Sequence, residues 1–218
     1  TISKFSNFRE YGSSLSLSTN IYGTFNFKKG RLKAIRHTIR PSVSFSYRPD
    51  FADRYNKTIE NNLDGTEFET YSPFSNGISL YGMPGAGLSN SIGISINNVV
   101  EGKLAPKDPD SDEEDEKITI LNNLNFSSSY NIAADSLRWS PVNTTMGTRI
   151  FKDKLAINLN ATLDPYQIND SGQRINKFVK GLFRLTRANL TANYSISSRD
   201  LNGENDNESS DRNSGNGN

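Results

Sequence analysis

The chain lacks several features that would place it in common functional classes. None of its 218 residues is cysteine, which excludes a disulfide framework and a thiolate metal site. No apolar run approaches the roughly 18 residues that a transmembrane helix requires. Basic and acidic residues nearly balance at a net charge of +1, so nothing favours a nucleic-acid partner. Only 33% of the residues are hydrophobic, which is little material for the core of a soluble globule.

Catalytic signatures are also missing. His37 is the only histidine, and no paired carboxylate stands at a useful spacing from it. The glycine-rich segment 82–87 lacks the GKS or GKT ending and the following helix of a phosphate loop, so we interpret it as a turn. We therefore expect neither enzyme activity nor a cofactor.

The apolar residues that are present alternate with small polar ones. In residues 13–27, leucine, isoleucine and phenylalanine share one parity, while serine and asparagine dominate the other. A period of two over this length predicts a strand longer than the mean of about 5–6 residues. Comparable patterns mark about eight strand candidates: 13–27, 36–47, 77–81, 91–99, 117–134, 137–150, 154–163 and 182–198. Because no segment predicts a helix, the expected fold class is all-β and antiparallel.

Polar connections separate the strand candidates. Residues 48–75 and 165–180 are expected to be long loops, and residues 106–116 form an acidic loop. The connections do not alternate strictly between short and long, because two short ones, near 133–137 and 151–154, follow each other.

Two architectures fit this pattern. A soluble β-sandwich alternates because one face of each sheet is covered and the other is solvated. A transmembrane barrel turns apolar side chains toward lipid and pairs every backbone group without leaving an edge. The candidates of about 10–15 residues match the strand length that crosses a bilayer, and aromatic residues gather at their ends, as in outer-membrane barrels. We predict that residues 1–198 form part of an antiparallel transmembrane β-barrel and that 199–218 are a disordered tail or a truncated loop.

Two stretches resemble a known family. Residues 34–51, AIRHTIRPSVSFSYRPDF, place Ile39, Pro41, Phe45, Tyr47 and Pro49 in the pattern L-x-P-x-x-x-Y-x-Y-x-P. That pattern is similar to a strand in the barrel domain of the lipopolysaccharide-assembly outer-membrane protein LptD, also called OstA or Imp. Residues 135–165, beginning DSLRWSP, resemble a later hairpin of the same barrel, and both stretches are closest to the branch found in Bacteroidetes. Since no terminal aromatic strand is present, we interpret the chain as an internal fragment of a larger barrel.

The resemblance implies a transport function in which no bond is made or broken. Lipopolysaccharide would pass from periplasmic bridge proteins through the barrel and leave by a lateral opening into the outer leaflet, with a plug lipoprotein in the lumen. The implied partners are lipopolysaccharide, these proteins and membrane lipids, and the implied location is the bacterial outer membrane. Two alternatives remain open, namely a porin or nutrient-transporter barrel and a soluble or surface-anchored β-sheet binding module.

Parity places four arginines on the side of the strands that would face the lumen. They are Arg36, Arg40, Arg149 and Arg187. A guanidinium group binds phosphate bidentately, so these residues are candidate contacts for the phosphates of lipopolysaccharide. The alternative is that they pair with carboxylates of the lumen or contact water.

Two prolines fall within the strand candidates. Pro41 and Pro141 each remove one backbone donor, which would weaken the pairing of a wall strand and help it to flex. The alternative for Pro41 is a strand end or a β-bulge.

The acidic run in residues 106–116 contains Asp108, Asp110 and Asp112, whose carboxylates are hard ligands of the kind that bind Ca²⁺ or Mg²⁺. The run lacks the glycine and the spacing of an EF-hand loop. A solvated acidic loop is the alternative interpretation, and we expect no dedicated metal site.

Overall fold

The computed structural model describes residues 7–60, 67–75, 82–108, 114–151, 154–181 and 183–196. Its strands are β1 (Ser13–Ser18), β2 (Ile21–Asn26), β3 (Leu32–Arg48), β4 (Lys57–Glu60), β5 (Phe68–Tyr71), β6 (Ser89–Leu104), β7 (Glu116–Asn131), β8 (Val142–Ile150), β9 (Leu155–Asp164), β10 (Tyr166–Ile168), β11 (Arg174–Phe178) and β12 (Arg184–Tyr194). The described residues contain one helix, α1 (Phe51–Tyr55), which is five residues long. In this part of the chain no helix has the length and apolar character needed to span a membrane. The all-β, antiparallel prediction is confirmed.

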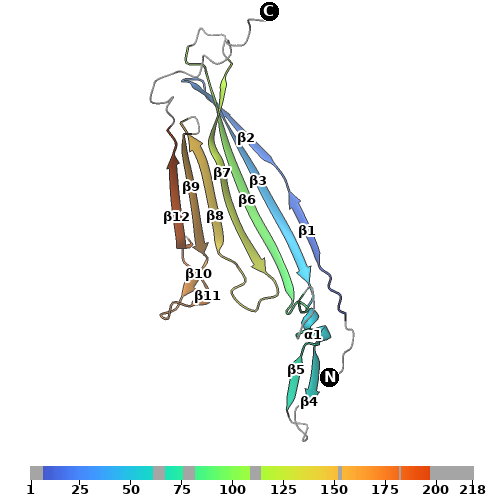
Figure 1. The fold of residues 1–218 in the computed structure, drawn as a ribbon. Coiled ribbons are helices and arrows are strands. Elements are labelled where there is room, and N and C mark those ends of the chain that lie inside the picture. Colours follow the sequence, from blue (N-terminus) through green and yellow to red (C-terminus); the bar gives the residue numbers. More distant parts are fainter. Residues whose placement is uncertain are drawn as a thin grey trace, which may run out of the picture.

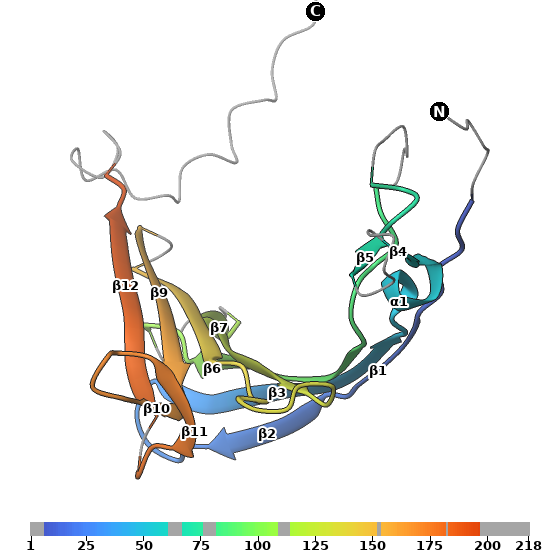
Figure 2. The ribbon, with the colours of Figure 1, turned by 90° about the horizontal axis from the view of Figure 1, so that it is seen from below.

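One sheet contains eight of the strands. Its order is β1-β3-β6-β7-β8-β9-β12, with β2 pairing to β3 beside β1, and every pairing is antiparallel. The sheet is a single curved layer, as Figures 1 and 2 show. Among the described residues, β1 with β2 forms one open edge and β12 forms the other, so these strands form an open sheet, and the larger barrel of which it would be part stays a prediction.

The connections fall into two groups at opposite ends of the sheet. Since neighbouring strands run antiparallel, alternate connections lie at the same end. Connections 27–31, 105–115 and 151–154 lie at what we call the short-turn end, at the top of Figure 1. The connections from β3 to β6, from β7 to β8 and from β9 to β12 belong to the opposite end, which we call the long-connection end because it contains the two longest, 49–88 and 165–183.

The connections differ in part from the sequence-based prediction. The predicted strand at 77–81 lies outside the described residues and stays a prediction, while β3 pairs directly with β6 in the sheet. The predicted succession of two short connections, near 133–137 and 151–154, came from starting a strand too early, because β8 begins at Val142 and the first of these connections spans 132–141. The predicted irregular loop at 48–75 also contains α1 and the β4–β5 hairpin, and the loop at 165–180 contains the β10–β11 hairpin.

Pro41 explains a break in the first strand. The sequence predicted one strand over 13–27, but the pairing to β3 stops at Thr19 and Asn20 and resumes in the same register with β2. Thr19 N–H donates to the Pro41 carbonyl oxygen at 3.2 Å. The reciprocal bond cannot form because proline has no N–H, and in an antiparallel pair both bonds belong to one pair of residues. Pro41 thus lies inside β3, neither at a strand end nor in a bulge, and its missing donor faces β1 and β2.

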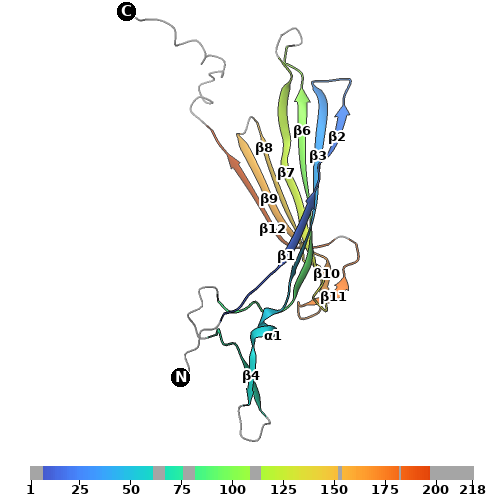
Figure 3. The ribbon, with the colours of Figure 1, turned by 90° about the vertical axis from the view of Figure 1, so that its right-hand side faces the viewer.

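The long 49–88 connection packs against the start of the chain. Phe51 of α1 is 1% exposed, and its ring contacts that of Tyr11 with 5.1 Å between centroids. Phe8 packs edge-to-face on Phe74 at 4.8 Å. Gly85 N–H donates to the carboxylate of Glu10. These contacts hold the segment before β1 against the 49–88 connection at the long-connection end of the sheet, beside α1 and β4 in Figure 3.

Pro41→Val should restore the missing donor opposite Thr19. One added backbone hydrogen bond contributes about 1 kcal/mol, so amide exchange at Thr19, whose N–H donates to residue 41, should slow about fivefold. Hydrogen–deuterium exchange with mass spectrometry of the native protein measures this change. Pro141→Val is the matched control, since Pro141 precedes β8. Unchanged exchange at Thr19 would show that Pro41 is not the cause of the break.

Candidate functional site: the polar face of the sheet

The register divides the sheet into two chemically different faces. One row of paired residues crosses the polar face from β1 to β12 through Ser18, Ser42, Ser95, Ser127, Asn143, Thr162 and Arg187. The hydroxyl oxygens of Ser42 and Ser95 are 2.8 Å apart. Because serine, asparagine and threonine carry no charge, this surface offers many weak hydrogen-bonding groups and few fixed ion pairs.

The opposite face is apolar and uncovered. One of its rows runs through Ile21, Ile39, Asn98, Leu124, Met146, Leu159 and Leu190. Leu15 is 61% exposed and Leu190 is 68% exposed, although both are large aliphatic side chains. Two of its polar residues, His37 and Asn98, hydrogen-bond to each other at 3.1 Å. A continuous apolar surface of this kind marks contact with a membrane or another protein.

The structure places all four predicted arginines on the polar face but does not gather them. Arg36 pairs with Glu101, while Arg40 lies opposite Asn97 and has no ion pair among the described residues. Arg149 lies on β8, and Arg187 on β12 is separated from β3 by four strands, or roughly 24 Å along the sheet. They could form separate contact points along a surface, but they do not form one binding pocket.

A charged cluster at the short-turn end was missed by sequence reasoning. The Asp115 carboxylate accepts hydrogen bonds from Lys103 Nζ at 2.8 Å and from Lys33 Nζ at 2.5 Å, so it links β3 and β6 at the start of β7. These two ammonium groups, Lys103 first, lower the pKa of Asp115 below its ordinary value of 3.8. Nearby, Arg36 Nε donates to Glu101 Oε2 at 2.8 Å. Only the strand register could have revealed these partners.

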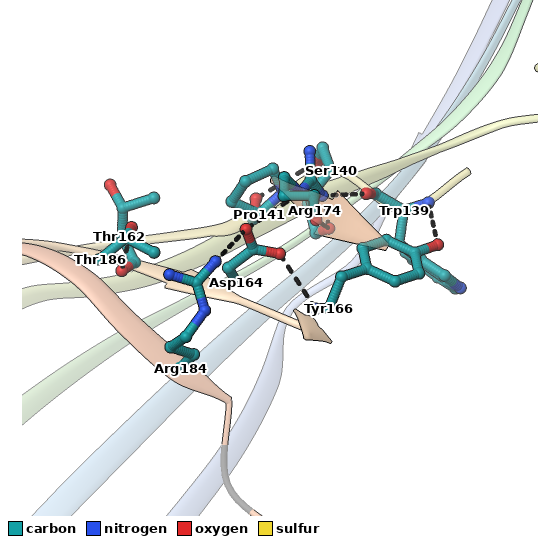
Figure 4. Close-up of polar contacts among 10 residues, drawn as sticks. Trp139, Ser140, Pro141, Thr162, Asp164, Tyr166, Arg174, Arg184 and Thr186 are labelled. Atoms are coloured by element: carbon teal, nitrogen blue, oxygen red, sulfur yellow. Dashed lines mark hydrogen bonds and ion pairs between the residues drawn. The ribbon is translucent and has the colours of Figure 1, made fainter. Parts of the chain in front are cut away.

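A second cluster fixes the β10–β11 hairpin at the long-connection end (Figure 4). The Asp164 side chain is 4% exposed, and its Oδ2 accepts from Arg184 Nη2 at 2.9 Å. Arg174 Nε lies 3.0 Å from the same oxygen, close enough for an ion pair although its N–H does not point at it. Tyr166 N–H donates to Asp164 Oδ1 at 3.0 Å.

The same cluster extends to the connection before β8. The guanidinium of Arg174 lies over the Tyr166 ring at 5.1 Å, and its Nη2 donates to the Trp139 carbonyl oxygen at 3.3 Å. Trp139 N–H in turn donates to the Tyr166 hydroxyl at 3.1 Å, and the Tyr166 ring stacks on that of Phe178. These contacts position two long connections against each other.

The remaining predicted residues lie at the ends of strands. Pro141 precedes β8, because that strand begins at Val142 and not at residue 137 as predicted. Asp108 is exposed, and Asp110 and Asp112 lie outside the described residues. In the described part of the chain, no group of three or more histidine or carboxylate side chains could hold a metal ion.

The fold and its two faces define a class, that of amphipathic antiparallel β-sheet proteins with an uncovered apolar surface. The family model described as LptD protein matches residues 1–166. The chain therefore belongs to the LptD protein family, which connects it at a general level to lipopolysaccharide transport and assembly. No curated protein and no solved structure matches the chain.

Asp164→Asn should loosen the β10–β11 hairpin. The substitution leaves two guanidinium groups without their carboxylate; because both are about one-third exposed, we expect a local cost of about 2 kcal/mol, below the fully buried range. Amide exchange across β10–β11 should then accelerate about 30-fold. Asp170→Asn, in the exposed turn of the same hairpin, should leave exchange unchanged, and equal effects of the two variants would contradict the proposed anchoring.

Acid should open the short-turn end through Asp115. Because the folded state lowers the pKa of this carboxylate, its ion pairs contribute fully above the ordinary value of 3.8 and are lost as the pH falls through the lower folded value. Amide exchange at Lys33 and Lys103, corrected for intrinsic rates, should rise on acidification below pH 4. In Asp115→Asn the exchange should already be fast at pH 7 and independent of pH. A wild-type response that persists in this variant would assign the effect to another group.

Proposed function

We propose that the chain forms part of the wall of an outer-membrane β-barrel that passes lipopolysaccharide to the outer leaflet. The observation on which the proposal rests is the exposed apolar face of a single-layer sheet in a chain of the LptD protein family. In water this face would drive aggregation, whereas in a bilayer its apolar side chains contact the hydrocarbon of the lipids. The family match directs the transport proposal toward lipopolysaccharide.

Closure of the sheet follows from the same physics. The edges at β1 with β2 and at β12 expose backbone donors and acceptors, which cost several kilocalories per mole each when left unpaired in hydrocarbon. In the proposed barrel both edges pair with further strands. The polar face then lines the lumen, where serine, asparagine and threonine contact water.

Aromatic residues support a transmembrane placement. Phe25, Phe151 and Tyr194 lie at the short-turn end, and all three are more than half exposed. Tyr130 and Trp139 lie at the long-connection end, where their rings pack edge-to-face. Aromatic side chains form such girdles at both lipid interfaces of outer-membrane barrels. Because bacterial barrels have short periplasmic turns and long outer loops, the short-turn end faces the periplasm.

The Pro41 seam supports a lateral exit. The pairing between β3 and the edge formed by β1 and β2 lacks one hydrogen bond in the middle of the wall, so it separates there at lower cost than an intact seam. Lipopolysaccharide would move along the polar face and leave through the wall into the outer leaflet. The proposed partners are periplasmic bridge proteins and a plug lipoprotein, and no bond of the lipid is made or broken.

Depletion of the native protein tests this function. We expect the protein in the outer-membrane fraction, and we expect surface lipopolysaccharide, measured by antibody binding to intact cells, to fall several-fold on depletion. Lipopolysaccharide should accumulate inside the cell envelope at the same time. A protein found in the soluble fraction, or unchanged surface lipopolysaccharide combined with reduced uptake of small solutes, would overturn the proposal.

A further inference from the structure

A hollow on the polar face lies at the short-turn end, between β2, β3, β6 and β7. Its volume is about 180 Å³ and its lining residues are Thr24, Ala34, Arg36, Glu101, Gly102 and Lys103, with Lys117. Ala34 lies directly opposite Lys103, and its methyl side chain leaves the space open. We call this feature the cationic hollow.

Positive charge exceeds negative charge among the residues that line the cationic hollow. The lining contains three cations, Arg36, Lys103 and Lys117, and one carboxylate, Glu101, whereas Lys33 and the carboxylates Glu114, Asp115 and Glu116 are not part of it. Asp115 is shared between two lysines, and Glu101 uses only one oxygen, Oε2, for both Arg36 Nε and Nη2. Lys117 has no ion pair within the described part of the chain. The lining by itself therefore carries a net charge of +2.

The position of Lys117 makes this excess significant. Lys117 and Lys103 are directly opposite partners on β7 and β6. Like charges in such cross-strand pairs are destabilising, because their side chains lie side by side. Neither asparagine nor serine, which fill this face elsewhere, would carry that cost. Asp115 contacts Lys103, and an anion that also reached Lys117 would remove the remaining cost.

We propose that the cationic hollow binds a dianionic phosphate monoester. The two lysines supply strong point charges, and Arg36, whose side chain is 58% exposed, keeps Nη1 free to donate alongside them. A phosphate of charge near −2 matches the excess of two positive charges. Arg40 lies four residues further along β3 on the same face, about 13 Å away, and offers a next contact for the same group.

The identity of the phosphate carrier rests on the proposed function. In the proposed orientation, the cationic hollow lies at the periplasmic end of the lumen, where an incoming lipopolysaccharide headgroup would first contact the barrel wall. Free phosphate has the same chemistry, so the experiment must separate the two sources.

Site-specific photocrosslinking in the native protein tests the lipid source. A photoreactive residue at Ala34 should form an adduct with lipopolysaccharide in outer membranes, detected by antibody on separated protein. Lys103→Gln with Lys117→Gln should reduce this adduct at least fivefold, and replacing both by arginine should restore it. Lys28→Gln with Lys29→Gln removes the same charge from the turn of the short-turn end outside the hollow, and should leave the adduct unchanged.

Amine footprinting of the purified protein tests free phosphate. Inorganic phosphate should slow the acylation of Lys103 and Lys117 more than that of Lys28 and Lys29. Protection without an adduct at Ala34 would identify free phosphate as the ligand and retain the site. The absence of both, or equal loss of adduct in the turn variant, would overturn it.

The depletion experiment separates failure of the site from failure of the transport function. If depletion lowers surface lipopolysaccharide while the adduct and the protection are both absent, the site is wrong and the transport function stands. If phosphate protects the two lysines in a protein whose depletion has no effect, the site stands and the transport function is wrong.

Discussion

Backbone pairing between neighbouring strands is the interaction on which the rest of the structure depends. A single-layer sheet has no core to hold it together. Among the described residues, the buried large apolar side chains are Phe51 and Tyr166, and neither belongs to the eight-stranded sheet. Each strand is therefore held mainly by its ladder of hydrogen bonds and by side-chain pairs on the same face. This makes the register unusually informative, since it decides which residues share a face and a row.

Three sites change the strength of this backbone pairing, and each has a place in the proposed function of the wall. Pro41 removes a bond from the first seam, and the charged groups around Asp115 add bonds across β3 and β6 near the beginning of β7. At the opposite end, Asp164 fixes the last long connection to the sheet. The wall thus combines one loosened seam with two reinforced ends, which would allow one part of it to separate while the remainder keeps its shape.

The sequence predicts the faces of this sheet better than its charge partners. Alternation alone places Arg36, Arg40, Arg149 and Arg187 on the polar face, because side-chain direction in a strand depends only on parity. The partners Glu101 and Asp115 depend on the pairing of distant strands, which no local pattern encodes. Insertions and breaks were also harder to predict than faces. The β4–β5 hairpin consists of two strands of four residues, too short for a clear period. The break at Thr19 arises from Pro41 on the neighbouring strand, so residues 13–27 taken by themselves look continuous.

The packing of the 49–88 connection has a consequence for the speed and order of folding. Closing a long loop costs entropy that rises with the logarithm of its length, and β3 and β6 can pair only after this loop closes. Phe51 N–H and Ala52 N–H both donate to the Gly85 carbonyl oxygen, and Arg48 Nη2 donates to the carbonyl oxygens of Ala86 and Gly87. Once these contacts form, the ends of β3 and β6 are held together as if by a tight turn. Pairing of β3 with β6 can then proceed from Arg48 and Ser89 toward the short-turn end. Its rate would resemble that of hairpin formation, because the loop is already closed.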